Sequence, residues 1–242
     1  RLFESLGCVL VTVGDAPDGC NINLACGSTH PARLAAEVVA HGCRLGVAFD
    51  GDGDRAILVD HRGHIVDGDA LLLILGAHYQ RQGRLTANTV VATVMSNLGF
   101  IQAMRAHGVR VDQAKVGDRY VLESMNANGF TLGGEQSGHV IMSEFATTGD
   151  GVLTALHLAA RMVRTGKPLR ELAAVMVRLP QVMINVPNVN KLRASLDPVL
   201  QQAVTAAGRE LGDTGRVLLR PSGTEPLDNV SKAILPEAGV SC

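Results

Sequence analysis

The sequence is poor in aromatic residues and carries almost no net charge. It contains no tryptophan, and aromatic residues make up only 3% of its 242 residues, too few for a surface on which nucleic-acid bases stack. Lysine and arginine number 22 against 23 aspartate and glutamate residues, a formal net charge of −1, so the positive field that attracts nucleic acid or an anionic membrane is lacking. We therefore expect neither nucleic acid nor a membrane as a partner.

Three further absences bear on the compartment. The longest apolar runs, such as residues 70–77, are far shorter than the roughly 20 residues of a membrane span. Residues 1–20 lack the charged-then-apolar pattern of a leader segment. The five cysteines are odd in number and include no Cys-x-x-Cys pair. These features predict a soluble protein of the reducing cytoplasm.

Short β-rich runs alternate along the chain with segments of helical periodicity, which is typical of an α/β fold with a largely parallel sheet. From about residue 178 the pattern changes to that of a small α+β domain. The expected domains are residues 1–66, 67–177 and 178–242. Strands are predicted at 8–13, 44–50, 56–60 and 89–95, and helices at 28–42, 69–83, 98–108, 118–127 and 149–166.

The strongest local signal is the segment FDGDGDR at residues 49–55. Asp50, Asp52 and Asp54 alternate with glycines directly after a predicted strand, so the backbone can curl and bring the three carboxylates to one point. Mg²⁺ takes oxygen ligands and keeps positions open for water or phosphate. These aspartates are therefore the candidate metal ligands, and a solvated acidic turn is the structural alternative.

Three other interpretations of this segment fit less well. An EF-hand loop needs glycine and glutamate where Arg55 and His61 stand. A relaxed dinucleotide-binding pattern spans residues 51–56, but its carboxylates would repel a pyrophosphate and a strand follows it. A phosphatase loop of the haloacid-dehalogenase type expects threonine or valine in place of Asp54, and it leaves the later motifs unexplained.

The second signal is GGEQSGH at residues 133–139, which presents Glu135, Ser137 and His139 at alternate positions. A carboxylate beside a hydroxyl is well suited to binding adjacent sugar hydroxyls, because the carboxylate accepts two hydrogen bonds. His139 is either a further contact, a proton carrier near neutral pH, or a structural residue.

The third signal is RPSGTEP at residues 220–226. Arg220 supplies a bidentate fork, Ser222 and Thr224 supply hydroxyls, and Gly223 lets backbone amides approach, which together predict a phosphate cradle.

A weaker signal is KVGDRYV at residues 115–121. Lys115 and Arg119 would add positive charge toward a phosphate, although such residues at a strand-to-helix junction are commonly plain surface residues.

In this order, the four motifs resemble those of the α-D-phosphohexomutase superfamily, and within it the branch that interconverts the 6- and 1-phosphates of glucosamine on the route to UDP-N-acetylglucosamine. The resemblance implies consecutive α/β domains with mixed sheets flanked by helices, then a small α+β domain. It assigns Mg²⁺ to the three aspartates with Arg55 beside them, the sugar to Glu135 and Ser137, and the non-reacting phosphate to loop 220–224. His139 is the candidate for handling a proton.

Two departures from the family pattern qualify this expectation. The superfamily transfers its phosphoryl group from a serine in a Ser-His-Asn-Pro-like loop, and these 242 residues contain no such string. After Pro226 the chain has Asp228 and Asn229 where an apolar residue and a second arginine are usual. We therefore expect part of a mutase, inactive alone, with a phosphomannomutase or phosphoglucomutase activity or a non-catalytic phosphosugar-binding module as the alternatives, and a homodimer as an open prediction.

Overall fold

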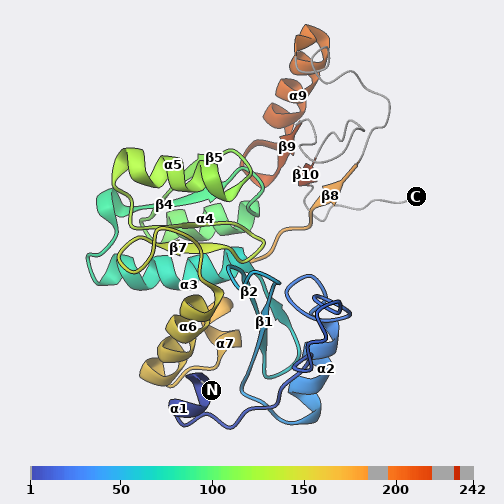
Figure 1. The fold of residues 1–242 in the computed structure, drawn as a ribbon. Coiled ribbons are helices and arrows are strands. Elements are labelled where there is room, and N and C mark those ends of the chain that lie inside the picture. The colour runs from blue at the N-terminus through green and yellow to red at the C-terminus, as the bar shows by residue number, and fades with distance from the viewer. Residues whose placement is uncertain (1, 185–195, 220–231, 235–242) are drawn as a thin grey trace. The chain divides into compact units, whose positions relative to one another are not determined.

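The computed structural model describes residues 2–184, 196–219 and 232–234 (Figure 1). The chain divides into two compact units: residues 1–96 with 100–176, and residues 97–99 with 177–242. The boundary expected between residues 66 and 67 lies inside the first unit and stays a prediction. Within the described residues, no helix combines the length and apolar character needed to cross a bilayer.

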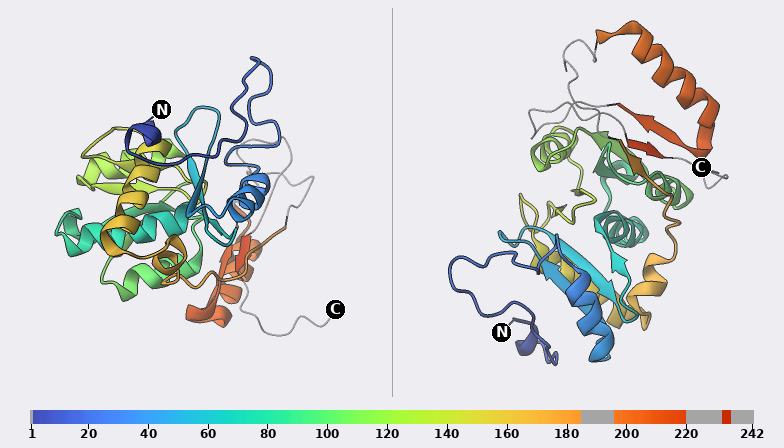
Figure 2. Two further views of the ribbon diagram at one scale, coloured as in Figure 1. Left: turned by 90° about the horizontal axis from the view of Figure 1, so that it is seen from below. Right: turned by 90° about the vertical axis from the view of Figure 1, so that its right-hand side faces the viewer.

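The first unit begins with a three-stranded antiparallel sheet in the order β1-β2-β3, formed by β1 (Leu45–Phe49), β2 (Ala56–Asp60) and β3 (Ile65–Val66). Helix α2 (Ala32–Ala40) lies along one face of this sheet and α6 (Gly151–Thr165) along the other (Figures 1 and 2). Only six residues connect β1 to β2, which is too short for a parallel crossover. This sheet is therefore antiparallel rather than parallel.

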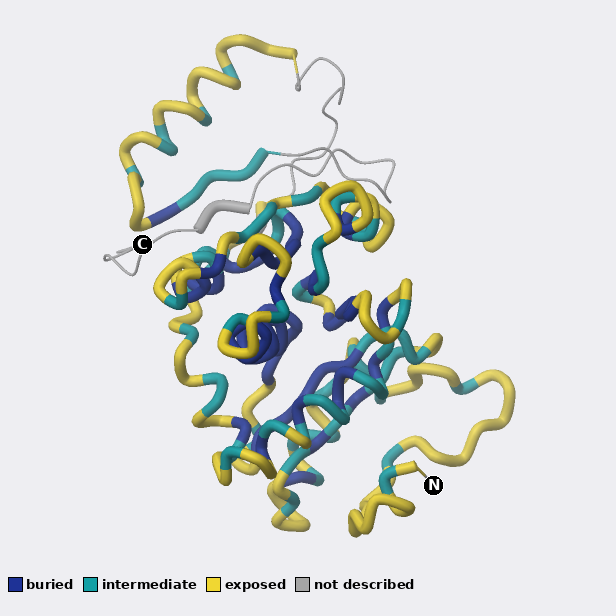
Figure 3. The backbone as a smooth tube through the Cα atoms, turned by 90° about the vertical axis from the view of Figure 1, so that its left-hand side faces the viewer, coloured by how far each residue is buried: buried dark blue, intermediate teal, exposed yellow. Residues whose placement is uncertain are grey.

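The strand predicted at residues 8–13 does not form. After the short helix α1 (Leu2–Ser5), this apolar run is irregular, and Val9 is 99% exposed. Figure 3 shows most of the segment as exposed backbone. A β-rich run becomes a strand only beside a hydrogen-bonding partner, and none of the described strands pairs with it.

The predicted turn between β2 and β3 is present, and Asp60 closes it. The Asp60 carboxylate is 1% exposed and accepts hydrogen bonds from the backbone amides of Arg62 at 2.8 Å and His64 at 3.0 Å. Burial raises the pKa of Asp60, but these amides and the His64 ring outweigh it, so the net pKa lies below its usual range. Gly63 completes the turn at φ +84°.

The second sheet of this unit is mixed and has the order β5-β4-β6-β7. Its strands are β4 (Thr89–Thr93), β5 (Arg110–Ala114), β6 (Leu132–Gly134) and β7 (Val140–Met142). Strand β4 runs parallel to β5 and β6, and β7 turns back antiparallel to β6. The elements that lead into or connect its strands are α3 (Gly68–Arg81), η1 (Thr86–Asn88), α4 (Leu98–Ala106) and α5 (Asp118–Asn128), and the short helix α7 (Leu169–Ala173) follows α6.

Two apolar clusters show how the helices cover this sheet. Leu71 of α3 and Met104 of α4 belong to the main core, whereas Val121 and Met125 of α5 pack with Val91 of β4 in a separate cluster. Helices α4 and α5 therefore lie on opposite faces. Because adjacent strands β4 and β5 lead into helices on opposite faces, their carboxyl ends form the crevice where α/β folds place ligands.

In the part of the second unit that the structure describes, a small antiparallel sheet accompanies one long helix. Its elements are β8 (Val182–Met183), α9 (Pro198–Leu211), η2 (Gly212–Thr214), β9 (Arg216–Leu218) and β10 (Lys232–Ile234), with the strand order β8-β10-β9. Asp197 caps α9 by accepting from the amides of Val199 and Leu200. Strand β10 was not expected from the sequence.

Candidate functional site

The predicted metal-binding segment forms the loop between β1 and β2, and Arg55 folds back over it. Asp50 accepts a hydrogen bond from the Arg55 backbone amide at 3.2 Å, and its second oxygen lies 3.8 Å from Arg55 Nε. Gly53 adopts φ +74°, which lets the chain curl there. Asp52 is exposed and Asp54 is half-buried.

Asp54 is bound by His139 from the predicted sugar-binding segment, 85 residues further along the chain. The Asp54 Oδ2 to His139 Nδ1 distance is 2.9 Å, and His139 is only 1% exposed. The other ring nitrogen, Nε2, accepts a hydrogen bond from the Gly149 amide at 3.2 Å. Because Nε2 accepts, Nδ1 carries the hydrogen and donates it to Asp54. Both ring nitrogens of His139 are therefore occupied.

The carboxylate oxygens of Asp50, Asp52 and Asp54 suit a hard divalent cation, but they do not converge on one point. Among the described residues, no group of three or more His, Cys, Asp or Glu side chains is arranged to hold a metal ion. Asp54 Oδ1, however, is buried and has no hydrogen-bond partner, and such an oxygen is satisfied by a cation. Asp50, Asp52 and Asp54 thus fit Mg²⁺ chemically, and the metal site stays a prediction.

The two loops are also joined through their backbones. The Ala56 amide donates to the Gly138 carbonyl at 3.1 Å, and the Gly151 amide at the start of α6 donates to the Gly53 carbonyl at 2.9 Å. A Cβ atom on Gly138 would lie 2.2 Å from the Ala56 carbonyl oxygen, and one on Gly151 would lie 2.5 Å from the Arg55 oxygen. Only glycine permits these approaches.

Helix α3 contacts the sugar-binding loop in the same way. The Gly68 amide, at its first residue, donates to the Gln136 carbonyl at 3.0 Å, and a Cβ atom on Gly68 would lie 2.0 Å from the Glu135 carbonyl oxygen. The helix is capped by Asp67, which accepts from the Ala70 amide at 3.3 Å. The loop is thereby fixed to a helix of which 12 of 14 residues are buried.

The side chain of Glu135 joins the sugar-binding loop to the segment after β5. Glu135 is 9% exposed and accepts a hydrogen bond from the Gly117 amide at 3.0 Å. Both loops follow the carboxyl ends of strands that run parallel to β4. Glu135 therefore lies at the edge of the sheet where the crevice is expected.

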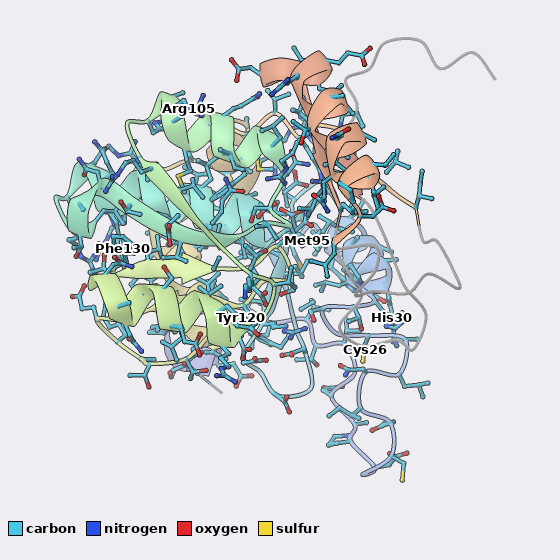
Figure 4. All side chains as sticks on the ribbon, turned by 90° about the horizontal axis from the view of Figure 1, so that it is seen from above. Cys26, His30, Met95, Arg105, Tyr120 and Phe130 are labelled. Carbon is cyan, nitrogen blue, oxygen red and sulfur yellow. The ribbon has the colours of Figure 1, made fainter. Side chains whose placement is uncertain are left out.

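The remaining predicted residues at this edge are exposed. Ser137 lies at the surface beside Glu135. Lys115 Nζ lies 5.6 Å from the Tyr120 ring centroid, with Tyr120 on the first turn of α5 (Figure 4). Arg119 Nε lies 2.7 Å from the Glu123 carboxylate, which raises the pKa of the arginine. Neither cation contacts Glu135.

The predicted phosphate loop cannot be compared, because Arg220, Ser222, Gly223 and Thr224 lie outside the described residues. Sequence reasoning missed two backbone groups that the structure brings in, the amides of Gly117 and Gly149. A glycine before a helix-starting aspartate was the available signal at both positions.

A cavity of about 510 Å³ borders the metal-binding loop and was also not predicted. Its lining includes Asp50 and Gly51 of this loop together with Cys26 and His30. Cys26 and His30 come from the segment before α2 and are labelled in Figure 4. The cavity extends this site toward the amino-terminal segment of the unit.

Comparison with known proteins places the chain in a family. The family model "Phosphoglucomutase/phosphomannomutase, alpha/beta/alpha domain III" matches residues 67–179, and the model for the C-terminal domain of the same family matches residues 183–229. The phosphoglucosamine mutase of Cutibacterium acnes is 65% identical over 228 residues, covering 94% of this chain and 51% of the relative. That of a Nocardioides species is 59% identical over 242 residues, covering 100% and 54%.

Solved structures show the same fold. A phosphoglucomutase/phosphomannomutase family protein of Burkholderia thailandensis superposes with a TM-score of 0.76 at 25% identity, covering 98% of this chain and 53% of that one. The Aspergillus fumigatus N-acetylphosphoglucosamine mutase, solved with GlcNAc-6P and magnesium, has a TM-score of 0.66 at 18% identity over 89% and 54%. The chain spans about half the length of the curated relatives it matches. It belongs to the phosphoglucomutase/phosphomannomutase family and is a homologue of the carboxyl-terminal half of phosphoglucosamine mutases.

Proposed function

We propose that this chain is the carboxyl-terminal half of a cytoplasmic phosphoglucosamine mutase. The whole enzyme would interconvert glucosamine 6-phosphate and glucosamine 1-phosphate, through a phosphoserine and a bisphosphate intermediate, to supply UDP-N-acetylglucosamine synthesis. One observation carries the proposal: the hydrogen bonds from His139 to Asp54 and from the Gly117 amide to Glu135 join three separate motifs into one site.

The carboxylates of Asp50, Asp52 and Asp54 would hold Mg²⁺, which when bound offsets negative charge on the transferred phosphoryl group. Arg55, held against Asp50, places a second positive charge beside this loop. Since Asp54 presents a buried oxygen without a partner, it is the ligand best prepared for the ion.

Glu135 and Ser137 would bind the sugar hydroxyls. The Gly117 amide occupies one oxygen of Glu135 and fixes the carboxylate, and a carboxylate has about four acceptor positions in all. A rigid acceptor that binds two adjacent hydroxyls can hold the sugar in either orientation, as a reaction at both ends of the molecule requires. Lys115 and Arg119 would attract the phosphate, and residues Arg220, Ser222, Gly223 and Thr224 would hold it.

For His139, the geometry favours positioning over proton transfer. Its two nitrogens are engaged by Asp54 and Gly149, and its ring is buried, so it holds the Asp54 carboxylate in one orientation. Histidine and carboxylate partners behind a metal site commonly act in this way.

The proposal is tested by fusing this chain to the upstream half of the Cutibacterium acnes enzyme, which is 65% identical to it over 228 residues. We expect the chain alone to be inactive and the fusion to convert glucosamine 6-phosphate. Replacing Glu135 with glutamine in the fusion should lower kcat/KM by about 10- to 100-fold, the effect of losing one or two charged hydrogen bonds.

Two controls make the result decisive. Mannose 6-phosphate and glucose 6-phosphate, assayed with the same fusion, test the alternative hexose activities. A folded fusion that binds glucosamine 6-phosphate without converting it, while the parent enzyme converts it, would contradict the proposal and favour a non-catalytic binding module.

A further inference from the structure

A second cavity lies in the first unit, among helix ends that the proposed function does not use. Its volume is about 360 Å³, within the range of small-molecule sites. Arg81, Arg161, His107 and Lys167 line it, and Ile74 and Leu172 are among its apolar residues.

This cavity lies at the opposite end of the unit from the proposed active site. Helix α3 leads into β4 and α4 leads into β5, so their carboxyl-terminal ends approach the amino ends of those strands. Glu135 and Lys115 follow the carboxyl ends of β6 and β5 instead. Helix α6 begins at Gly151 beside the metal-binding loop, and its 15 residues, at about 1.5 Å per residue, place its far end roughly 20 Å away.

The positive charges around this cavity are not compensated within the described residues. The Nε of Arg161 is buried without a hydrogen-bond partner, and neither Arg161 nor Arg81 forms an ion pair with a described residue. The single acid among the described lining residues, Glu171, is bound by Lys167 at 2.5 Å. Arg161, which is half-buried, and Arg81, which is exposed, thus line the cavity without an acidic partner among the described residues.

Neighbouring positive charges disfavour the charged form of Arg161 and of a nearby histidine. Burial, followed by the charges of Arg81 and Arg164, lowers the pKa of Arg161. Burial, followed by the charges of Arg161, Arg81, Arg84 and Arg164, lowers the pKa of the neighbouring His78 to about 4, so His78 is neutral at pH 7. Groups that repel one another in this way are relieved when an anion binds.

Favourable interaction with helix dipoles explains only part of the cluster. Cations in the last turn of a helix are stabilised by its carbonyl end, which accounts for Arg81 on α3 and Arg164 on α6. Arg161 lies earlier in α6, and its Nε is buried. The dipole does not account for that buried, unpartnered group.

We propose that this cavity binds a small phosphate monoester, with Arg161 and Arg81 holding the phosphate and the apolar residues contacting the organic part. A guanidinium group presents a planar fork that matches phosphate oxygens. A dianion would offset both unpaired arginines, and Ile74 and Leu172 provide the apolar surface that inorganic phosphate alone would leave unused.

Phenyl phosphate is the first probe, because it has no sugar hydroxyls for Glu135 to bind, and inorganic phosphate is the second. Binding to the ¹⁵N- and methyl-labelled chain is followed by NMR. We expect phenyl phosphate to shift the methyl signals of Ile74 and Leu172 and to bind more tightly than inorganic phosphate. At about 100-fold excess over Kd, it should raise Tm by roughly 5–10 °C.

The variant Arg161→Gln removes the charged side chain whose Nε is buried, and Arg105→Gln is the matched control. Arg105 projects from the surface of α4 and does not line the cavity (Figure 4). We expect R161Q to weaken phenyl phosphate binding about 10- to 100-fold and R105Q to leave it within twofold. Because the Arg161 charge is unfavourable in the empty cavity, R161Q should also fold at least as stably as the parent chain.

Two results would overturn the proposal. One is equal binding to R161Q and R105Q, which would place the phosphate elsewhere. The other is the absence of any shift at the Ile74 and Leu172 methyl groups at saturating phenyl phosphate. Neither result depends on turnover, so both are separate from a failure of the proposed mutase activity.

Discussion

The His139 side chain offers a direct test of how the candidate site is held together. Replacing His139 with phenylalanine keeps a ring but removes both nitrogen contacts, the one to Asp54 and the one from the buried Gly149 amide. A buried group that loses its partner costs about 1–3 kcal/mol, and a half-exposed carboxylate less because water reaches it. Together these predict a loss of about 3 kcal/mol, or roughly 6–12 °C in Tm for a unit of this size.

The variant His139→Asn separates positioning from proton transfer. The asparagine amide nitrogen stands close to where Nδ1 was, so it can still donate to Asp54. We expect H139N to lose about 1–2 kcal/mol, because only the contact with Gly149 is lost. We also expect it to bind Mn²⁺, a spectroscopic substitute for Mg²⁺, more tightly than H139F, which should lose about 10- to 100-fold in affinity.

The measurements are urea unfolding and Mn²⁺ titration followed by electron paramagnetic resonance. His41, whose ring lies 3.2 Å from Glu37 at an exposed position, gives the control: H41F should change stability by about 0.5 kcal/mol or less. This role of His139 is wrong if H139F unfolds within 1 kcal/mol of the parent chain, or if H139N binds Mn²⁺ no better than H139F. If His139 transferred a proton in the reaction, H139N would be as inactive as H139F in the active fusion.

Three further predictions follow from close contacts in the first unit. Gly149→Ala would place a Cβ atom 2.5 Å from the His139 ring, so we expect the free energy of unfolding, measured with urea, to fall by about 1–3 kcal/mol. The control is Gly208→Ala in α9, where nothing lies within 4 Å of the added Cβ atom. This control should raise the free energy of unfolding by up to about 1 kcal/mol. Gly68→Ala should be worse than Gly149→Ala, since its Cβ atom would meet the rigid backbone of the sugar-binding loop at 2.0 Å; equal stability of the two variants would show that this loop yields. Asp60→Ala should lower the free energy of unfolding by about 2–3 kcal/mol at pH 7. Because the folded-state pKa of Asp60 is depressed, the stability difference between Asp60→Ala and the parent chain should be constant above about pH 5 and shrink as the pH falls below about 4. A stability difference that does not change with pH would contradict the role of the carboxylate.

Much of the fold could be predicted because hydrophobic periodicity is a local property of the chain. The segment predicted as a helix at 149–166 is α6 (Gly151–Thr165), and the strand predicted at 89–95 contains β4 (Thr89–Thr93). Asp and Gly residues at the ends of such segments also mark caps and turns locally, as Asp150 and Gly166 do for α6.

The failures share a different cause, since each depends on a partner distant in sequence. The run at 8–13 has strand propensity but no strand pairs with it among those described, and β10 exists through its pairing with β8 and β9. The motif residues were found from their chemistry. Their partners, the amides of Gly117 and Gly149, were not, because the glycine before a helix-starting aspartate marks a turn but does not say which side chain its amide will meet in the fold.

The backbone contacts between the loops also determine how the site can be observed. Ala56, Gly68 and Gly151 are the first residues of β2, α3 and α6. Amide hydrogens at the ends of such elements ordinarily exchange with solvent quickly, yet each of these three is bonded to a carbonyl of another segment. They can exchange only when the metal-binding loop, the sugar-binding loop and the ends of α3 and α6 move apart. Deuterium uptake at these three positions therefore reports the opening of the site itself, with no need for ligand, metal or turnover.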